Sequence, residues 1–96
     1  SLTLNLTHAG AHLLFTNTAG CTVEVPLNST APFPIGTVIR LEQRDPTAPV
    51  TVSAATGVNV YRLATRDPIT IGRYGVITLT KTAQDDWNLS GDLAPA

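Results

Sequence analysis

The stretch YGVITLTKTAQDDWNLS, residues 74–90, decides the fold class of this chain. Its first half alternates with the period of a half-buried β-strand. The two faces of that alternation are Tyr74, Val76, Thr78 and Thr80 against Ile77, Leu79 and Lys81. Residues 84–86, QDD, predict a hairpin loop, after which Trp87 and Leu89 fall on one face of a returning strand. The segment therefore predicts a β-hairpin.

Working outward, short apolar or alternating runs recur along the whole chain, and nothing predicts a helix of useful length. The expected strands cover residues 2–6, 12–16, 22–25, 37–43, 50–54, 58–61, 69–71, 74–81 and 87–90. Residues 26–36, PLNSTAPFPIG, contain three prolines and a terminal glycine, which exclude both a helix and a central strand there. A spacing of about 8–12 residues between strands predicts an all-β fold, an antiparallel β-sandwich or barrel-like domain of about eight short strands.

The length of 96 residues allows one domain. We expect residues 1–11 to form an N-terminal arm or first strand, residues 12–93 the β-sandwich, and residues 94–96 a tail. A core this small is commonly supplemented by disulfides, a metal or oligomerisation. The lone Cys21 excludes an internal disulfide, and we interpret it as a small buried residue beside a turn, with an intermolecular disulfide or a reactive thiol as the alternatives.

The charge balance argues against two classes of partner. Six basic and seven acidic residues give a net charge of −1, which is not the basic footprint of a nucleic-acid-binding protein. The sequence contains neither an amphipathic basic helix nor an apolar run of about 18 residues, so it does not predict a membrane partner. With 43% hydrophobic and only 14% charged residues, we expect partners to cover part of the surface.

The residue types that carry chemistry do not form a recognisable catalytic or metal-binding pattern. His8 and His12 are four residues apart, but the segment between them does not read as a helix, so the spacing does not predict a zinc site. No Gly-x-Ser-x-Gly nucleophile motif is present. The carboxylates fall mostly in predicted turns: Glu24, Glu42, Asp45, Asp67, Asp85, Asp86 and Asp92. A glycosidase pair drawn from distant strands remains an alternative. We predict no enzymatic activity, no catalytic, cofactor-binding or metal residues, and no cofactor.

Aromatic residues and glycosylation patterns give weak signals. The five aromatics are too scattered for a stacking platform: Phe15, Phe33, Tyr61, Tyr74 and Trp87. Trp87 alternates with Leu89, and this pattern favours a core residue over a sugar-binding surface residue. The N-glycosylation patterns at Asn5, Asn28 and Asn88 are interpreted as incidental, since two of them fall inside predicted strands.

Taken in order, several segments resemble a small β domain found in tail-fibre and head-surface proteins of tailed bacteriophages. The segments are TVEVP (22–26), PFPIGTVI (32–39), VTV (50–52), GV (57–58), RYGVITLTK (73–81) and WNLSGDL (87–93). The resemblance covers roughly residues 12–93, and it implies no catalytic residues. In such proteins the domain often ends a longer fibre, whereas this chain contains the domain alone.

The motifs of this resemblance also have structural interpretations. Phe33, held between two prolines, is expected to plug the open end of the sandwich or a neighbouring subunit. Gly36 is expected to supply the turn into the following strand, and Trp87 to fill the core opposite Ile77 and Leu79.

The resemblance implies a non-enzymatic virion structural protein, located on the capsid or tail surface. We expect a capsid decoration or cement protein that binds the capsid exterior as a homotrimer, with the major capsid protein or another virion protein as partner. Residues 1–11 are then the expected capsid-facing arm. One alternative is a receptor-binding module of a tail fibre that contacts a host surface glycan or protein. A second is an unrelated carbohydrate-binding β-sandwich of a secreted enzyme.

Overall fold

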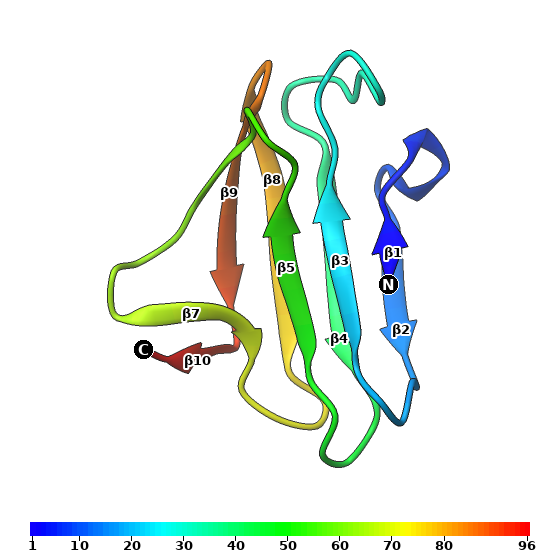
Figure 1. The fold of residues 1–96 in the computed structure, drawn as a ribbon, viewed down its shortest axis with the longest axis vertical. Coiled ribbons are helices and arrows are strands. Elements are labelled where there is room, and N and C mark those ends of the chain that lie inside the picture. The colour runs from blue at the N-terminus through cyan, green and yellow to red at the C-terminus, as the bar shows by residue number, and fades with distance from the viewer.

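The computed structural model describes residues 1–96 as two five-stranded β-sheets packed face to face (Figure 1). The strands are β1 (Leu2–Thr3), β2 (His12–Phe15), β3 (Cys21–Val25), β4 (Val38–Gln43), β5 (Val50–Ala54), β6 (Asn59–Tyr61), β7 (Arg66–Thr70), β8 (Val76–Ala83), β9 (Asp86–Gly91) and β10 (Leu93–Pro95). One 3-10 turn, η1 (Leu6–His8), follows β1. The first sheet has the order β1-β3-β5-β7-β10 and the second β2-β4-β8-β9-β6, which confirms the all-β sandwich.

The chain enters the two sheets alternately from β1 to β8, so four of the eight neighbouring pairs within the sheets are two strands apart in the sequence. Each such step crosses the sandwich, and this brings β1, β3 and β5 side by side in parallel. In all, four pairings are parallel and four antiparallel. The sheets are therefore mixed, not purely antiparallel as expected. β8 and β9 are the only consecutive strands that pair with each other, and a turn at Gln84–Asp85 joins them.

The core lies between the sheets and follows the alternation of the longest strands. In β4, Ile39 and Leu41 are buried while Arg40 is exposed, and in β8, Ile77 and Leu79 are buried. Sixteen apolar residues form one cluster: Leu4, Phe15, Val23, Val25, Ala31, Phe33, Ile39, Leu41, Val50, Val52, Val58, Ile77, Leu79, Trp87, Leu89 and Leu93. Burial of these side chains is the main force that holds the two sheets together.

The proline-rich segment 26–36 covers one end of this core. Phe33 is 3% exposed, and its ring meets the Trp87 ring edge-on, with centroids 5.4 Å apart. Gly36 adopts a φ of +93°, which suits glycine, and its N–H donates to the carbonyl of Lys81 at 2.8 Å. Phe33 thus plugs the end of the sandwich within its own chain, and Trp87 is a core residue, as predicted.

Three polar residues are buried in the core: Gln43, Thr70 and Lys81. The Thr70 hydroxyl donates to Gln43 Oε1 at 2.6 Å and accepts the Val50 N–H at 3.0 Å, while Gln43 Nε2 donates to the Asp45 carbonyl. This relay connects β4 in the second sheet to β5 and β7 in the first. Every buried side-chain nitrogen and oxygen atom has a hydrogen-bond partner.

Both ends of the chain belong to the first sheet. β1 pairs in parallel with β3, and Leu4 beside it is 1% exposed. Residues 94–96, expected as a tail, lie partly within β10, which pairs with β7. Asp67 and Pro68 were expected in the loop between the predicted strands 58–61 and 69–71, but they lie within β7, which begins at Arg66.

Candidate functional site

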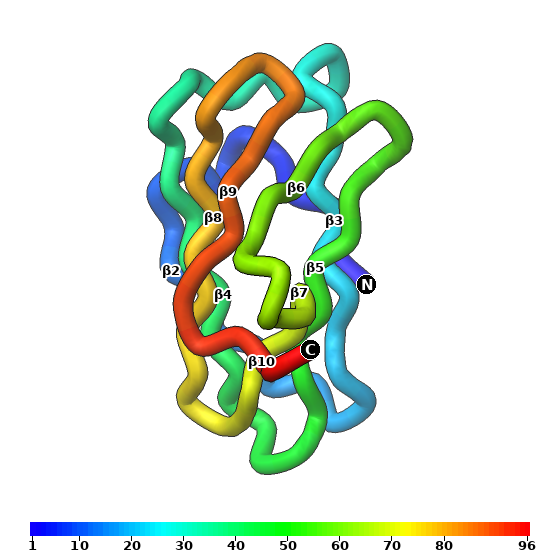
Figure 2. The backbone as a smooth tube through the Cα atoms, turned by 90° about the vertical axis from the view of Figure 1, so that its left-hand side faces the viewer, coloured from blue at the N-terminus to red at the C-terminus, as the bar shows by residue number.

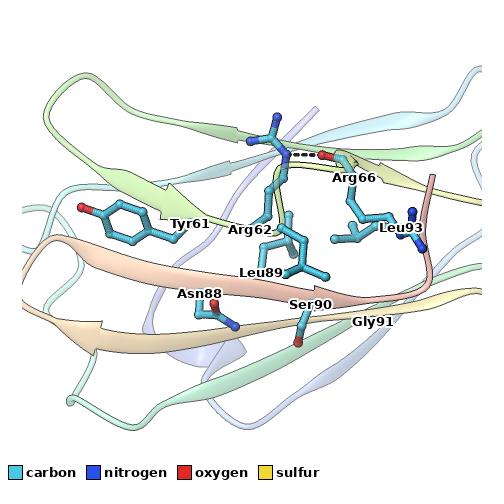
Figure 3. A pocket seen from close by; sticks show the side chains of 9 residues that line it. Tyr61, Arg62, Arg66, Asn88, Leu89, Ser90, Gly91 and Leu93 are labelled. Carbon is cyan, nitrogen blue, oxygen red and sulfur yellow. Dashed lines mark hydrogen bonds between the residues drawn. The ribbon is translucent and has the colours of Figure 1, made fainter. Parts of the chain in front are cut away.

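A groove of about 450 Å³ is lined by residues of β6, β7, β9 and β10 and of the connection between β6 and β7. Figure 2 shows these strands together on one flank of the sandwich. Its lining residues are Tyr61, Arg62, Leu63, Arg66, Asn88, Leu89, Ser90, Gly91 and Leu93. Leu89 and Leu93 are buried core residues and form an apolar floor (Figure 3). Tyr61, the last residue of β6, is exposed, and so is Leu63 on the chain that connects β6 to β7, where it is 71% exposed.

The groove exists because β6 is shorter than the strand it accompanies. β6 pairs with β9 only from Asn59 against Asp86 to Tyr61 against Asn88. The chain then leaves the second sheet and crosses to β7 in the first sheet. The outer edge of residues 89–91 consequently has no strand beside it. An unpaired strand edge is a template for another extended chain.

The charged groups of the groove are two arginines without a carboxylate partner. Arg62 Nε donates to the Arg66 carbonyl at 2.8 Å, and Arg66 Nη1 donates to the Thr65 carbonyl at 3.2 Å. The ion pairs of the structure involve only His12, Glu42 and Arg44. The remaining guanidinium N–H groups of Arg62 and Arg66 are free to bind a carboxylate, sulfate or phosphate. No carboxylate, histidine or cysteine lines the groove.

The two histidines have separate partners. The His8 Nδ1 accepts the backbone N–H of Asn5 at 3.0 Å and caps η1. The His12 Nε2 lies 2.8 Å from Glu42 Oε1, and the other oxygen of Glu42 accepts from Arg44. No group of three or more His, Cys, Asp or Glu side chains is placed to hold a metal ion.

The carboxylates of the turns bind backbone groups, as expected for turn acids. Asp45 accepts the N–H groups of Ala48 at 2.8 Å and Thr47 at 3.1 Å, and these bonds lower its pKa. Asp92 accepts the N–H of Val76 at 2.9 Å. The adjacent Asp85 and Asp86 have different partners, which are the Asn28 N–H and the Asn59 side chain.

The lone cysteine and the glycosylation patterns occupy ordinary positions. Cys21 opens β3, is half-buried, and carries a free thiol. Asn5 is the N-cap of η1 rather than a strand residue, while Asn88 lies in β9 as expected. Asn28 follows β3 and contacts two side chains from the β8–β9 hairpin.

Sequence analysis missed Arg62, Leu63, Arg66 and the buried Lys81. Arg62 and Leu63 lie between β6 and β7, and Arg66 opens β7. The sequence pattern there does not indicate a groove, because the groove depends on where the β6–β9 pairing ends. Lys81 did carry a signal, since the alternation of β8 placed it on the same face as Ile77 and Leu79.

Comparisons with protein-family models, curated proteins and solved structures found no match to this chain. The chain is a β-sandwich of two mixed sheets, and one flank has a groove beside the unpaired strand edge of residues 89–91. Its only helical element, η1, has three residues, and no helix has the length and apolar character required to cross a membrane.

Proposed function

We propose that this chain is a non-enzymatic virion structural protein, a capsid decoration protein that binds the capsid exterior as a homotrimer. The observation that carries the proposal is the number of large apolar side chains left in solvent on so small a domain. They are Leu6, Leu14, Ile35, Tyr61, Leu63, Ile71 and Tyr74. We assign these side chains to contacts with other proteins. The resemblance to small β domains of tailed-phage virion proteins supports the choice of partner.

The sheet orders offer a way to close a trimer. A cyclic trimer joins two different surfaces of the chain, repeated around the axis. The edge strands β1 and β2 lie on one flank of the sandwich, and β6 and β10 lie on the opposite flank. We therefore place the groove flank, with exposed Tyr61 and Leu63, against the β1/β2 flank of the next subunit. The contact covers the apolar side chains of both flanks.

The oligomeric state tests this arrangement directly. Light scattering at micromolar concentration is expected to give three times the chain mass of 10.1 kDa. Leu63→Glu places a charge in the proposed contact and is expected to give a monomer. Ile35→Glu is the matched control, because Ile35 is equally exposed, at 70%, but lies in the segment that covers the end of the sandwich. A parent chain that stays monomeric contradicts the trimer.

Capsid binding tests the role. The purified chain is expected to co-sediment at a fixed stoichiometry with expanded, DNA-free capsids prepared without it, and to raise their resistance to heat. A chain that coats host cells and leaves capsids unbound contradicts the decoration role.

The two free arginines favour a second candidate, a receptor-binding module that holds an acidic host glycan in the groove. Guanidinium groups bind carboxylates in a fixed, two-pronged geometry. Under this candidate, a galacturonate oligomer binds the chain, the neutral galactose oligomer does not, and Arg62→Gln weakens binding. Equal binding of the two oligomers contradicts it.

A further inference from the structure

The amine of Lys81 is enclosed at the end of the sandwich covered by segment 26–36. Lys81 is 2% exposed, and its Nζ donates to Asn28 Oδ1 at 2.5 Å and to the Phe33 carbonyl at 2.8 Å. The ring of Trp87 lies 5.9 Å from Nζ. A primary amine on an almost fully buried side chain therefore faces one carboxamide beside two aromatic residues.

The carboxamide is within reach of nucleophilic attack. Because a C=O bond is about 1.23 Å long, an Nζ–Oδ1 distance of 2.5 Å places Asn28 Cγ no more than about 3.7 Å from Nζ. The backbone N–H of Asn28 donates to Asp85 Oδ1 at 2.8 Å, which fixes Asn28 against the β8–β9 hairpin. Holding two reactants near attack distance makes their reaction effectively unimolecular.

The environment of Lys81 also favours the nucleophilic form of the amine. Burial lowers the pKa of Lys81, and the charge of Asp85 partly opposes this by raising it. A lysine whose amine is activated by burial away from solvent is an established type of nucleophile.

We propose that Lys81 and Asn28 condense within the folded chain to form an intramolecular amide cross-link. The neutral Nζ attacks Asn28 Cγ and a new Nζ–Cγ bond forms. The Cγ–Nδ2 bond then breaks, a proton passes from Nζ to the departing nitrogen, and one molecule of ammonia leaves. The atoms balance without any oxidant, metal or activating cofactor.

Asp85 is the positioning residue of this reaction. Its carboxylate holds the Asn28 backbone, and it is the carboxylate whose charge acts on Lys81. The resulting bond joins the segment that leaves β3 in the first sheet to β8 in the second. It supplies a covalent connection between the sheets in a chain that has one cysteine.

Intact mass spectrometry of the purified chain tests the cross-link. The parent chain is expected to be lighter than its sequence mass by one ammonia, and a digest is expected to contain a branched peptide that joins residues 28 and 81. Trypsin is expected to leave Lys81 uncut. A parent chain at full sequence mass overturns the proposal.

Two variants and one control separate the cross-link from other losses of ammonia. Lys81→Met keeps an unbranched apolar stem, and Asn28→Ala removes the carboxamide from a half-buried position. Both are expected to have full sequence mass. Asn59→Ala is the control, because Asn59 also binds a hairpin carboxylate but lies apart from Lys81, and it is expected to retain the loss. Loss of ammonia that persists in Lys81→Met indicates a cyclic imide at Asn28 and overturns the proposal.

The role of Asp85 is tested by the rate of cross-linking. Chain isolated unfolded from inclusion bodies is refolded, and the linked fraction is followed by mass. Asp85→Ala removes the acceptor that holds the Asn28 backbone and is expected to slow linking at least about tenfold, because the carboxamide is no longer held beside Nζ, while the circular dichroism of the refolded chain stays unchanged. An unchanged linking rate overturns the assignment of Asp85.

Discussion

Among single residues, Thr70 makes the most consequential polar contact between the sheets. Its hydroxyl satisfies both the Val50 N–H and Gln43 Oε1 inside the core. Thr70→Val keeps the shape of the side chain but leaves both groups unpaired. We expect the free energy of unfolding to fall by about 2 kcal/mol, the typical cost of burying unsatisfied polar groups. Urea denaturation monitored by circular dichroism measures it.

The matched control is Thr78→Val on the outer face of β8, where the threonine is half-buried and makes no side-chain hydrogen bond. It is expected to stay within about 0.5 kcal/mol of the parent. If both variants have the same stability, the relay is not stabilising.

The burial of single residues also shows what could be predicted from the sequence. Alternation alone placed Trp87, Ile77 and Leu79 in the core, because a half-buried strand buries every second side chain. It also put Lys81 on that face. The acceptors that make its burial possible come from Asn28 and Phe33, about fifty residues away, and local periodicity holds no information on such contacts.

Among the strands, the edge strand β2 is tied to β4 by an ion-pair chain. Glu42 binds Arg44 and His12, and these two hydrogen bonds, with that of Arg44 the larger, lower the pKa of Glu42 below its ordinary value of 4.5. A lowered carboxyl pKa stabilises the fold above 4.5, and this contribution is lost as the pH falls from there through the lowered pKa. Acid should therefore loosen β2.

We expect Glu42→Gln to show a smaller loss of thermal stability than the parent between pH 6 and about pH 3, because its amide does not titrate. Differential scanning calorimetry across that range measures the effect. Glu24→Gln is the control, since Glu24 is exposed and its carboxylate has no side-chain partner. Parallel pH curves for the Glu42 variant and the parent contradict the expectation.

The strands themselves were largely predictable, but their partners were not. The β8–β9 hairpin was predicted because both strands and the turn are adjacent in sequence. The parallel pairings of β1, β3 and β5 were not, since a strand has the same alternation whether the chain turns back beside it or crosses to the other sheet. The groove was missed for the same reason, because it reflects the end of the β6–β9 pairing.

In the whole molecule, the proposed cross-link and the Thr70–Gln43 relay connect the two sheets at opposite ends, because β4 lies beside Thr80 at Val38 and beside Val76 at Glu42. A cross-link between residues 28 and 81 closes a loop across a separation of 53 residues. On the chain-entropy model, closure of a loop of this length stabilises a fold by about 4 kcal/mol. This is a large contribution for a domain whose total stability is of the order of 5–15 kcal/mol.

The alternation of the chain between the two sheets also sets how the protein reaches its fold. Apart from the β8–β9 hairpin, every pair of neighbouring strands is separated in sequence by at least one other strand. Such non-local pairing places refolding on the millisecond-to-second timescale. Trp87 is the only tryptophan and is buried, so stopped-flow fluorescence reports core formation. Refolding within microseconds contradicts this expectation.

The same path has a consequence during synthesis. β6 finds its only neighbour in β9, and β4 is flanked on one side by β8, so the second sheet has no complete set of strands until β9 leaves the ribosome. The apolar faces of the earlier strands therefore stay uncovered until β9 has been made.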